Sequence, residues 1–181
     1  MQREFLNGRV EVKVGDITRE QVSAIVNAAN STLLGGGGVD GAIHAKGGER
    51  ILEECREIRR ADYPNGLPTG KVVMTSGGNL PARFVIHTVG PIYGMNDKND
   101  ALLLADCYVN SLELAIENNL RTIAFPSIST GAFGYPKHEA AKVSSNAIRD
   151  FLSKTDAIEE IRLVFFSESD AQLFVKHQIF T

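Results

Sequence analysis

Three polar side chains, Asn30, Asp40 and His44, are the residues of this sequence best suited to activating a water molecule. Asp40 and His44 lie four positions apart in a segment of helical periodicity, so both can project from one helix face. Asn30 precedes four consecutive glycines at positions 35–38 and could lie across them from the other two. A carboxylate, an amide and an imidazole at one cleft could orient a water for attack.

Each of these residues also has an ordinary structural explanation. Asp40 could cap the N-terminus of the helix that follows the glycines, a position that favours aspartate. His44 could be a packed core histidine. A metal site would need a third ligand beside Asp40 and His44, and the sequence offers none with suitable spacing, so we predict no metal.

Two loops are suited to binding an anion. The glycine loop (residues 30–38) contains the four glycines directly before a predicted helix. Glycine permits positive φ and close approach of backbone N–H groups, and a helix N-terminus attracts negative charge. The serine loop (residues 127–136) adds hydroxyls, small residues and two aromatic rings, Phe133 and Tyr135, which could stack on a sugar or base or could close the core. Two such loops at one cleft suit a diphosphate better than a single phosphate.

Segments rich in Val, Ile and Phe alternate with segments of helical period, which predicts an α/β fold. We expect Asp16 directly after a strand, where it could form a turn or accept hydrogen bonds from the amine of a base. Ligands of open α/β sheets bind beyond the carboxyl ends of the strands, so the three polar loops should meet at one edge. The expected strands are residues 10–14, 24–26, 71–75, 84–88, 122–125 and 161–166, and the expected helices are 39–58 (with a possible break at 47–48), 102–117, 138–152 and 171–178.

Composition narrows the class of protein. The 181 residues suit one domain, and the net charge of −3 excludes binding of nucleic acid by bulk electrostatics. No apolar run reaches the roughly 20 residues of a membrane span, and the N-terminus lacks a signal-peptide core. The two cysteines, Cys55 and Cys107, are too few for a disulfide framework. We therefore expect a cytoplasmic protein. A small one-domain protein of this kind could work as a monomer, which is the state we expect.

Several motifs, taken together, resemble the macrodomain family, the ADP-ribose-binding α/β/α sandwiches, and within it the MacroD-type branch. The resemblance covers nearly the whole chain and includes VGDIT at 14–18, IVNAAN at 25–30, LLGGGGVDGAIH at 33–44, LPTG at 67–70, VIHTVGP at 85–91 and FPSISTG at 125–131. It implies a single macrodomain over residues 1–181, built as a three-layer α/β/α sandwich with a mixed, mostly parallel central sheet.

The resemblance also implies a role for individual residues. Asp16 would bind the adenine amine with Ile17 beside it, and Phe166 would pack on the adenine. Asn30 and Asp40 match the pair held responsible for hydrolysis, with His44 in support. One side of the diphosphate would contact Gly37, Gly38 and Val39. The other side would contact Ser129, Thr130, Gly131, Ala132 and Phe133, with Phe133 near the distal ribose.

These residues imply a hydrolase that removes mono-ADP-ribose from acidic side chains of proteins and deacetylates O-acetyl-ADP-ribose. The bent diphosphate would hold a water at the distal ribose, where Asp40 and Asn30 would orient it without a cofactor. The expected partners are ADP-ribose, O-acetyl-ADP-ribose and mono-ADP-ribosylated proteins, with neither a membrane nor a nucleic acid among them. The alternative is a reader module that binds ADP-ribose without turnover and shares every binding residue.

Overall fold

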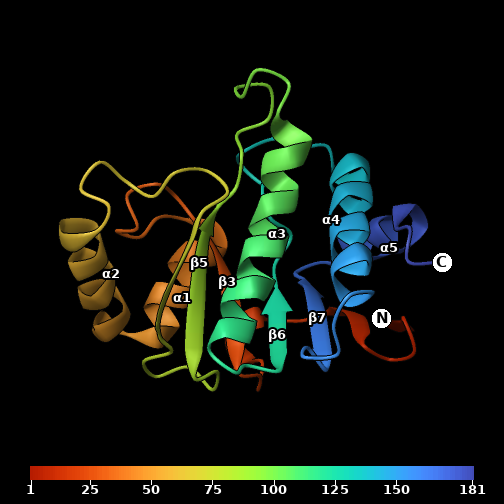
Figure 1. Ribbon diagram of the computed structural model, residues 1–181, viewed down its shortest axis with the longest axis horizontal. Helices are drawn as coiled ribbons and strands as arrows, with labels where there is room; N and C mark the ends of the chain where they lie inside the picture. The colour runs from red at the N-terminus through yellow and green to blue at the C-terminus, as the bar shows by residue number, and fades with distance from the viewer.

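The computed structural model describes residues 1–181 and contains one seven-stranded sheet between two layers of helices (Figure 1). The strand order is β1-β2-β7-β6-β3-β5-β4. The strands are β1 (Gln2–Phe5), β2 (Val10–Val14), β3 (Ala24–Ala29), β4 (Val72–Ser76), β5 (Phe84–Val89), β6 (Thr122–Phe125) and β7 (Glu160–Phe165).

The five inner strands pair in parallel, whereas β1 and β4 pair antiparallel at the two edges. The sheet is therefore mixed and mostly parallel, which confirms the predicted fold class. All five parallel strands end at the same edge, so the loops that follow them are brought together although they are far apart in sequence.

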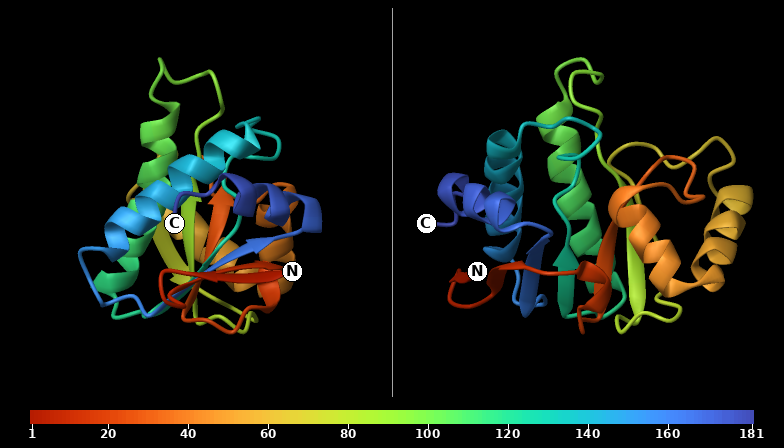
Figure 2. Two further views of the ribbon diagram at one scale, coloured as in Figure 1. Left: turned by 90° about the vertical axis from the view of Figure 1, so that its right-hand side faces the viewer. Right: turned by 180° about the vertical axis from the view of Figure 1, so that it is seen from behind.

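The helices are α1 (Gly38–Gly47), α2 (Glu49–Ala61), α3 (Asp100–Glu117), α4 (Lys137–Leu152) and α5 (Glu168–His177). One apolar cluster joins α3, α4 and α5 to one face of the sheet, and a second joins α1 and α2 to the opposite face. The view from behind shows α1 and α2 covering only the half of the sheet around β3 and β5 (Figure 2). No helix combines the length and apolar character that a membrane span requires.

Most predicted elements are present with small shifts at their ends. The predicted break at 47–48 is confirmed, because α1 ends at Gly47 and α2 begins at Glu49. The added Cβ of any larger residue at Gly47 would lie 2.1 Å from Ile51 Cδ1, so a substitution here would require the buried Ile51 side chain to shift.

One strand was missed and three boundaries were wrong. The sequence reading missed β1, whose residues are exposed or half-buried and lack an apolar face. It ended the second strand at residue 26, whereas β3 continues to Ala29 because Asn27 and Ala28 keep strand geometry beside β5. It also placed Phe166 in the last strand, which ends at Phe165, and began the last helix at 171, whereas Ser167 caps α5 at its true start.

Candidate functional site

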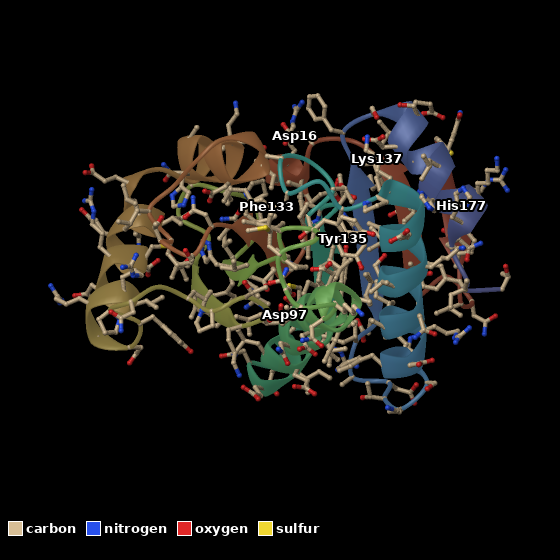
Figure 3. The ribbon with its side chains drawn as sticks, turned by 90° about the horizontal axis from the view of Figure 1, so that it is seen from above. Asp16, Asp97, Phe133, Tyr135, Lys137 and His177 are labelled. Atoms are coloured by element: carbon tan, nitrogen blue, oxygen red, sulfur yellow. The ribbon has the colours of Figure 1, made fainter.

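A cleft of about 800 Å³ lies at the edge where the parallel strands end. Its volume is in the range that holds a nucleotide-sized ligand. Figure 3, which looks down on this edge, shows Asp16 and Phe133 on neighbouring loops, with Asp97 farther away beside α3. The predicted site residues that line the cleft are Asp16, Ile17, Asn30, Gly37, Gly38, Val39, Asp40, Ser129, Thr130, Gly131, Ala132, Phe133 and Phe166.

His44 is the one predicted site residue that does not line the cleft. Its Nε2 lies 3.4 Å from Asp40 Oδ1, as the spacing of four residues on α1 predicted. The other ring nitrogen, Nδ1, is buried without a hydrogen-bond partner. His44 therefore stands behind Asp40 and has no direct contact with the cleft.

Two runs of backbone amides border the cleft without hydrogen bonds inside the protein. In the glycine loop and the first turn of α1, none of the N–H groups of residues 35–40 donates to a protein acceptor, and the same holds for residues 129–133 of the serine loop. An added Cβ at Gly37, Gly38 or Gly131 would meet no atom within 4 Å, so this backbone is open to a ligand. Unpaired amides on both sides of a cleft can bind anionic oxygen atoms.

The serine loop turns sharply at Ser129. This residue has φ +64°, a left-handed conformation that is uncommon outside glycine, and its side chain is buried. An added Cβ at Gly90 would lie 2.2 Å from Ser129 Oγ, so the glycine after β5 lets the loop pack this closely. Gly90 also lines the cleft and was not among the predicted site residues; its position two residues after the predicted strand 84–88 was the available signal.

The two aromatic rings of the serine loop point to different places. Phe133 lines the cleft, whereas Tyr135 is buried and packs edge-on against Tyr93 with ring centroids 5.0 Å apart. Both rings could have stacked on a ligand or closed the core, and Tyr135 does the second. Burial raises the pKa of its phenol to about 12.

At the end of the cleft near β2, Asp16 is exposed and caps the short 3₁₀ helix η1 (Ile17–Arg19). Asp16 Oδ1 accepts hydrogen bonds from the hydroxyl of Thr18 at 2.6 Å and from its N–H at 2.9 Å. The Thr18 hydroxyl is the main cause of a lowered pKa at Asp16, so the carboxylate stays ionised. Oδ2 has no partner in the protein and can accept another N–H.

Phe166 lies after β7 at the same end and is 93% exposed. Its neighbour Phe165 points the other way, into the core, and packs against Phe174. A large aromatic ring exposed beside a cleft can gain apolar contact only when something covers it. Phe166 is thus placed to contact a flat ring held by Asp16.

At the opposite end, Asp40 is buried in the first turn of α1, where the N-cap is Gly37. Asp40 therefore does not cap the helix. Its Oδ1 accepts a hydrogen bond of 2.7 Å from Asn27 Nδ2, and its Oδ2 has no protein partner. An added Cβ at Gly36 would lie 3.0 Å from Asp40 Oδ2 and 3.1 Å from Asn30 Nδ2, so both atoms face one small space.

Asn30 also holds the glycine loop together. Its Nδ2 donates to Gly35 O at 2.9 Å, and its Oδ1 accepts the N–H of Thr32 at 3.1 Å. An amide nitrogen carries two hydrogens, so Nδ2 can still donate one toward the space beside Gly36. No group of three or more His, Cys, Asp or Glu side chains is arranged to hold a metal ion.

Comparisons with known proteins agree with this geometry. The Macro domain family model matches residues 26–144. An O-acetyl-ADP-ribose deacetylase of Citrobacter koseri is 47% identical over 169 residues, which are 93% of this chain and 94% of that protein.

Two solved structures have the same fold. The Oceanobacillus iheyensis macrodomain with ADP is 47% identical, with a TM-score of 0.93, and the match covers 98% of this chain and 93% of that one. The Trypanosoma brucei macrodomain in complex with ADP-ribose is 39% identical, with a TM-score of 0.85, over 93% of this chain and 68% of that one.

Proposed function

The chain belongs to the Macro domain family, and from this premise we propose that it binds ADP-ribose and hydrolyses esters of it. The substrates are proteins carrying mono-ADP-ribose on acidic side chains, together with O-acetyl-ADP-ribose. The adenine would lie between Asp16 and Phe166, and the diphosphate between the two runs of unpaired amides. The distal ribose would then lie near Phe133 and Asp40.

One observation carries the hydrolytic part of the proposal: Asp40 Oδ2 and Asn30 Nδ2 face the same small space at the cleft. A water there could donate to the carboxylate and accept from the amide. With a glutamate ester at the anomeric carbon, the oxygen of the water would bond to that carbon while its bond to the ester oxygen breaks, and the glutamate carboxylate would leave with the electron pair. With O-acetyl-ADP-ribose, the water would add to the acetyl carbonyl carbon, the bond between that carbon and the ribose oxygen would break, and the ribose oxygen would leave as a hydroxyl after taking a proton. In both reactions Asp40 takes the proton of the water.

The name of the Citrobacter koseri protein supports ester hydrolysis, and the two solved relatives support a nucleotide in the cleft. The same cleft would also serve a reader that binds ADP-ribose without turnover. Turnover, not affinity, therefore separates the two functions.

The test is release of free ADP-ribose from a protein mono-ADP-ribosylated on glutamate. We expect release by the wild type, and a rate lower by about 100-fold or more in Asp40→Asn, which keeps the shape of the side chain but cannot take a proton. ADP-ribose affinity, measured by calorimetry, should stay within about 3-fold, because binding uses other groups. Binding without release by the wild type would favour the reader. Full activity of Asp40→Asn would exclude this mechanism.

A further inference from the structure

A line of four polar side chains leads from Asp40 into the apolar core beneath α1 and α2. Asn27 donates to Asp40 Oδ1 at 2.7 Å, and its Nδ2 lies 3.1 Å from His87 Nδ1. His87 Nε2 lies 2.9 Å from the hydroxyl of Thr75. Asn27 and His87 are fully buried, and Asp40 and Thr75 nearly so. The line therefore connects the cleft to the far edge of the sheet through a region that is otherwise apolar.

Sheet register brings these residues together. Asn27 in β3 is directly opposite His87 in β5, and Thr75 comes from β4, the next strand along. Buried polar groups require partners, and each here is supplied by a different strand or helix. The position of Asp40 thus depends on three strands as well as on α1.

The hydrogen bonds of the line have one consistent direction. Asn27 Nδ2 has two hydrogens, one for Asp40 Oδ1 and one for a ring nitrogen of His87, which must be unprotonated to accept it. The ring proton is thereby assigned to Nε2, which donates to Thr75, and the Thr75 hydroxyl donates to Ser76 O at 3.0 Å. If the Asn27 amide were rotated by 180°, its oxygen would face the carboxylate of Asp40, and two acceptors in contact repel each other.

Burial keeps His87 neutral, as this arrangement requires. Desolvation, with a smaller contribution from the nearby His44, lowers the pKa of His87 to about 3. Nδ1 is therefore free to accept at neutral pH. Asn27 Oδ1 has no hydrogen-bond partner, so the orientation of the amide depends only on the two bonds from Nδ2.

We propose that His87 is a positioning residue for the hydrolysis: by accepting from Asn27, it keeps an N–H on Asp40 Oδ1 and leaves Oδ2 turned toward the cleft. The inference rests on the proposed function. His87 itself does not line the cleft. If its Nδ1 were lost, one of the two bonds that orient Asn27 would be lost, and Asp40 could rotate away from the water. Small displacements of a group in the reacting geometry lower rates strongly.

Two substitutions separate positioning from a merely structural role. In His87→Asn the side-chain oxygen takes the place of Nδ1 and can still accept from Asn27. In His87→Gln the amide takes the place of Nε2, so the contact with Thr75 can persist while the acceptor for Asn27 is lost. We expect turnover at saturating O-acetyl-ADP-ribose to fall by about 10-fold or more in His87→Gln, and by less than about 3-fold in His87→Asn. ADP-ribose affinity should stay within about 2-fold in both.

Val85→Ala is the matched control. Val85 is also buried, two residues earlier on β5, and packs in the same apolar cluster without polar contacts. We expect it to lower the melting temperature and leave turnover of the folded protein within about 2-fold.

Four results would overturn the inference. Equal turnover in the Asn and Gln variants would remove the dependence on the Nδ1 acceptor. If the loss of turnover were proportional to the loss of melting temperature in all three variants, His87 would have only a structural role. Absence of turnover in the wild type would remove the proposed function, and the positioning role with it; wild-type turnover with fully active His87 variants would remove only the positioning role.

Discussion

The two ends of the cleft are built in different ways. At the end proposed for adenine, Asp16 is exposed and is held by Thr18, two residues away on its own turn. At the end proposed for the reaction, Asp40 is buried and is held by Asn27 from β3, with His44 beside it. A group that only binds can be supported locally, since a small adjustment preserves a hydrogen bond. A group that positions a water requires fixed geometry, and here the core of the fold supplies it.

After substitution of Asp40 itself, the largest effect at the two ends of the cleft is expected from Gly36→Ala. The new methyl would lie 3.0 Å from Asp40 Oδ2 and 3.1 Å from Asn30 Nδ2, in the space assigned to the water. We expect kcat for O-acetyl-ADP-ribose to fall by about 10- to 100-fold. At Gly37 the same methyl meets nothing within 4 Å, so Gly37→Ala should instead raise KM through the diphosphate. If both substitutions changed only KM, the water would not be beside Gly36.

A smaller effect, on affinity alone, is expected from Asp16→Ala at the adenine end. Its ionised carboxylate would lose a hydrogen bond to the adenine amine, and ADP-ribose affinity should fall by about 10-fold in a calorimetric titration. Ribose 5-phosphate lacks the adenine and serves as the control ligand. Equal losses for the two ligands would contradict the assignment of Asp16 to adenine.

The smallest effect is expected from Phe166→Ala. The ring is exposed at 93% and has little to pack on until adenine covers it, so its removal should weaken ADP-ribose binding by about 2- to 5-fold. Phe166→Tyr keeps the aromatic face and should bind as the wild type does. A loss of the same size in both variants would show that the phenylalanine acts in another way.

The sequence predicted the site better where the signal was local. The glycines at 35–38, the spacing of Asp40 and His44, and the loop after β6 could all be located from short motifs. β1 was missed because Gln2–Phe5 is a mostly exposed edge strand without an apolar face. Short motifs and helical spacing can be recognised from neighbouring residues alone, and the sequence of β1 contains neither.

The support of Asp40 could not be predicted in the same way. In the sequence, Asn27 directly follows the predicted strand 24–26, and His87 lies within the predicted strand 84–88. Their contact depends on the register between β3 and β5, which pairs residues 60 positions apart. Periodicity identifies strands, but it does not give the partner or the register.

The most direct test of a cleft with separate binding and reaction ends is one experiment on the wild type, Asp40→Asn and Asp16→Ala. Release of ADP-ribose from a glutamate-modified protein would be followed in single turnover over a range of enzyme concentrations, which gives a maximal rate and a half-saturating concentration. We expect a maximal rate lower by about 100-fold in Asp40→Asn, with the half-saturating concentration nearly unchanged. We expect the reverse in Asp16→Ala, where the half-saturating concentration rises by about 10-fold at a nearly unchanged maximal rate. If both substitutions altered the same parameter, the division of the cleft would be contradicted.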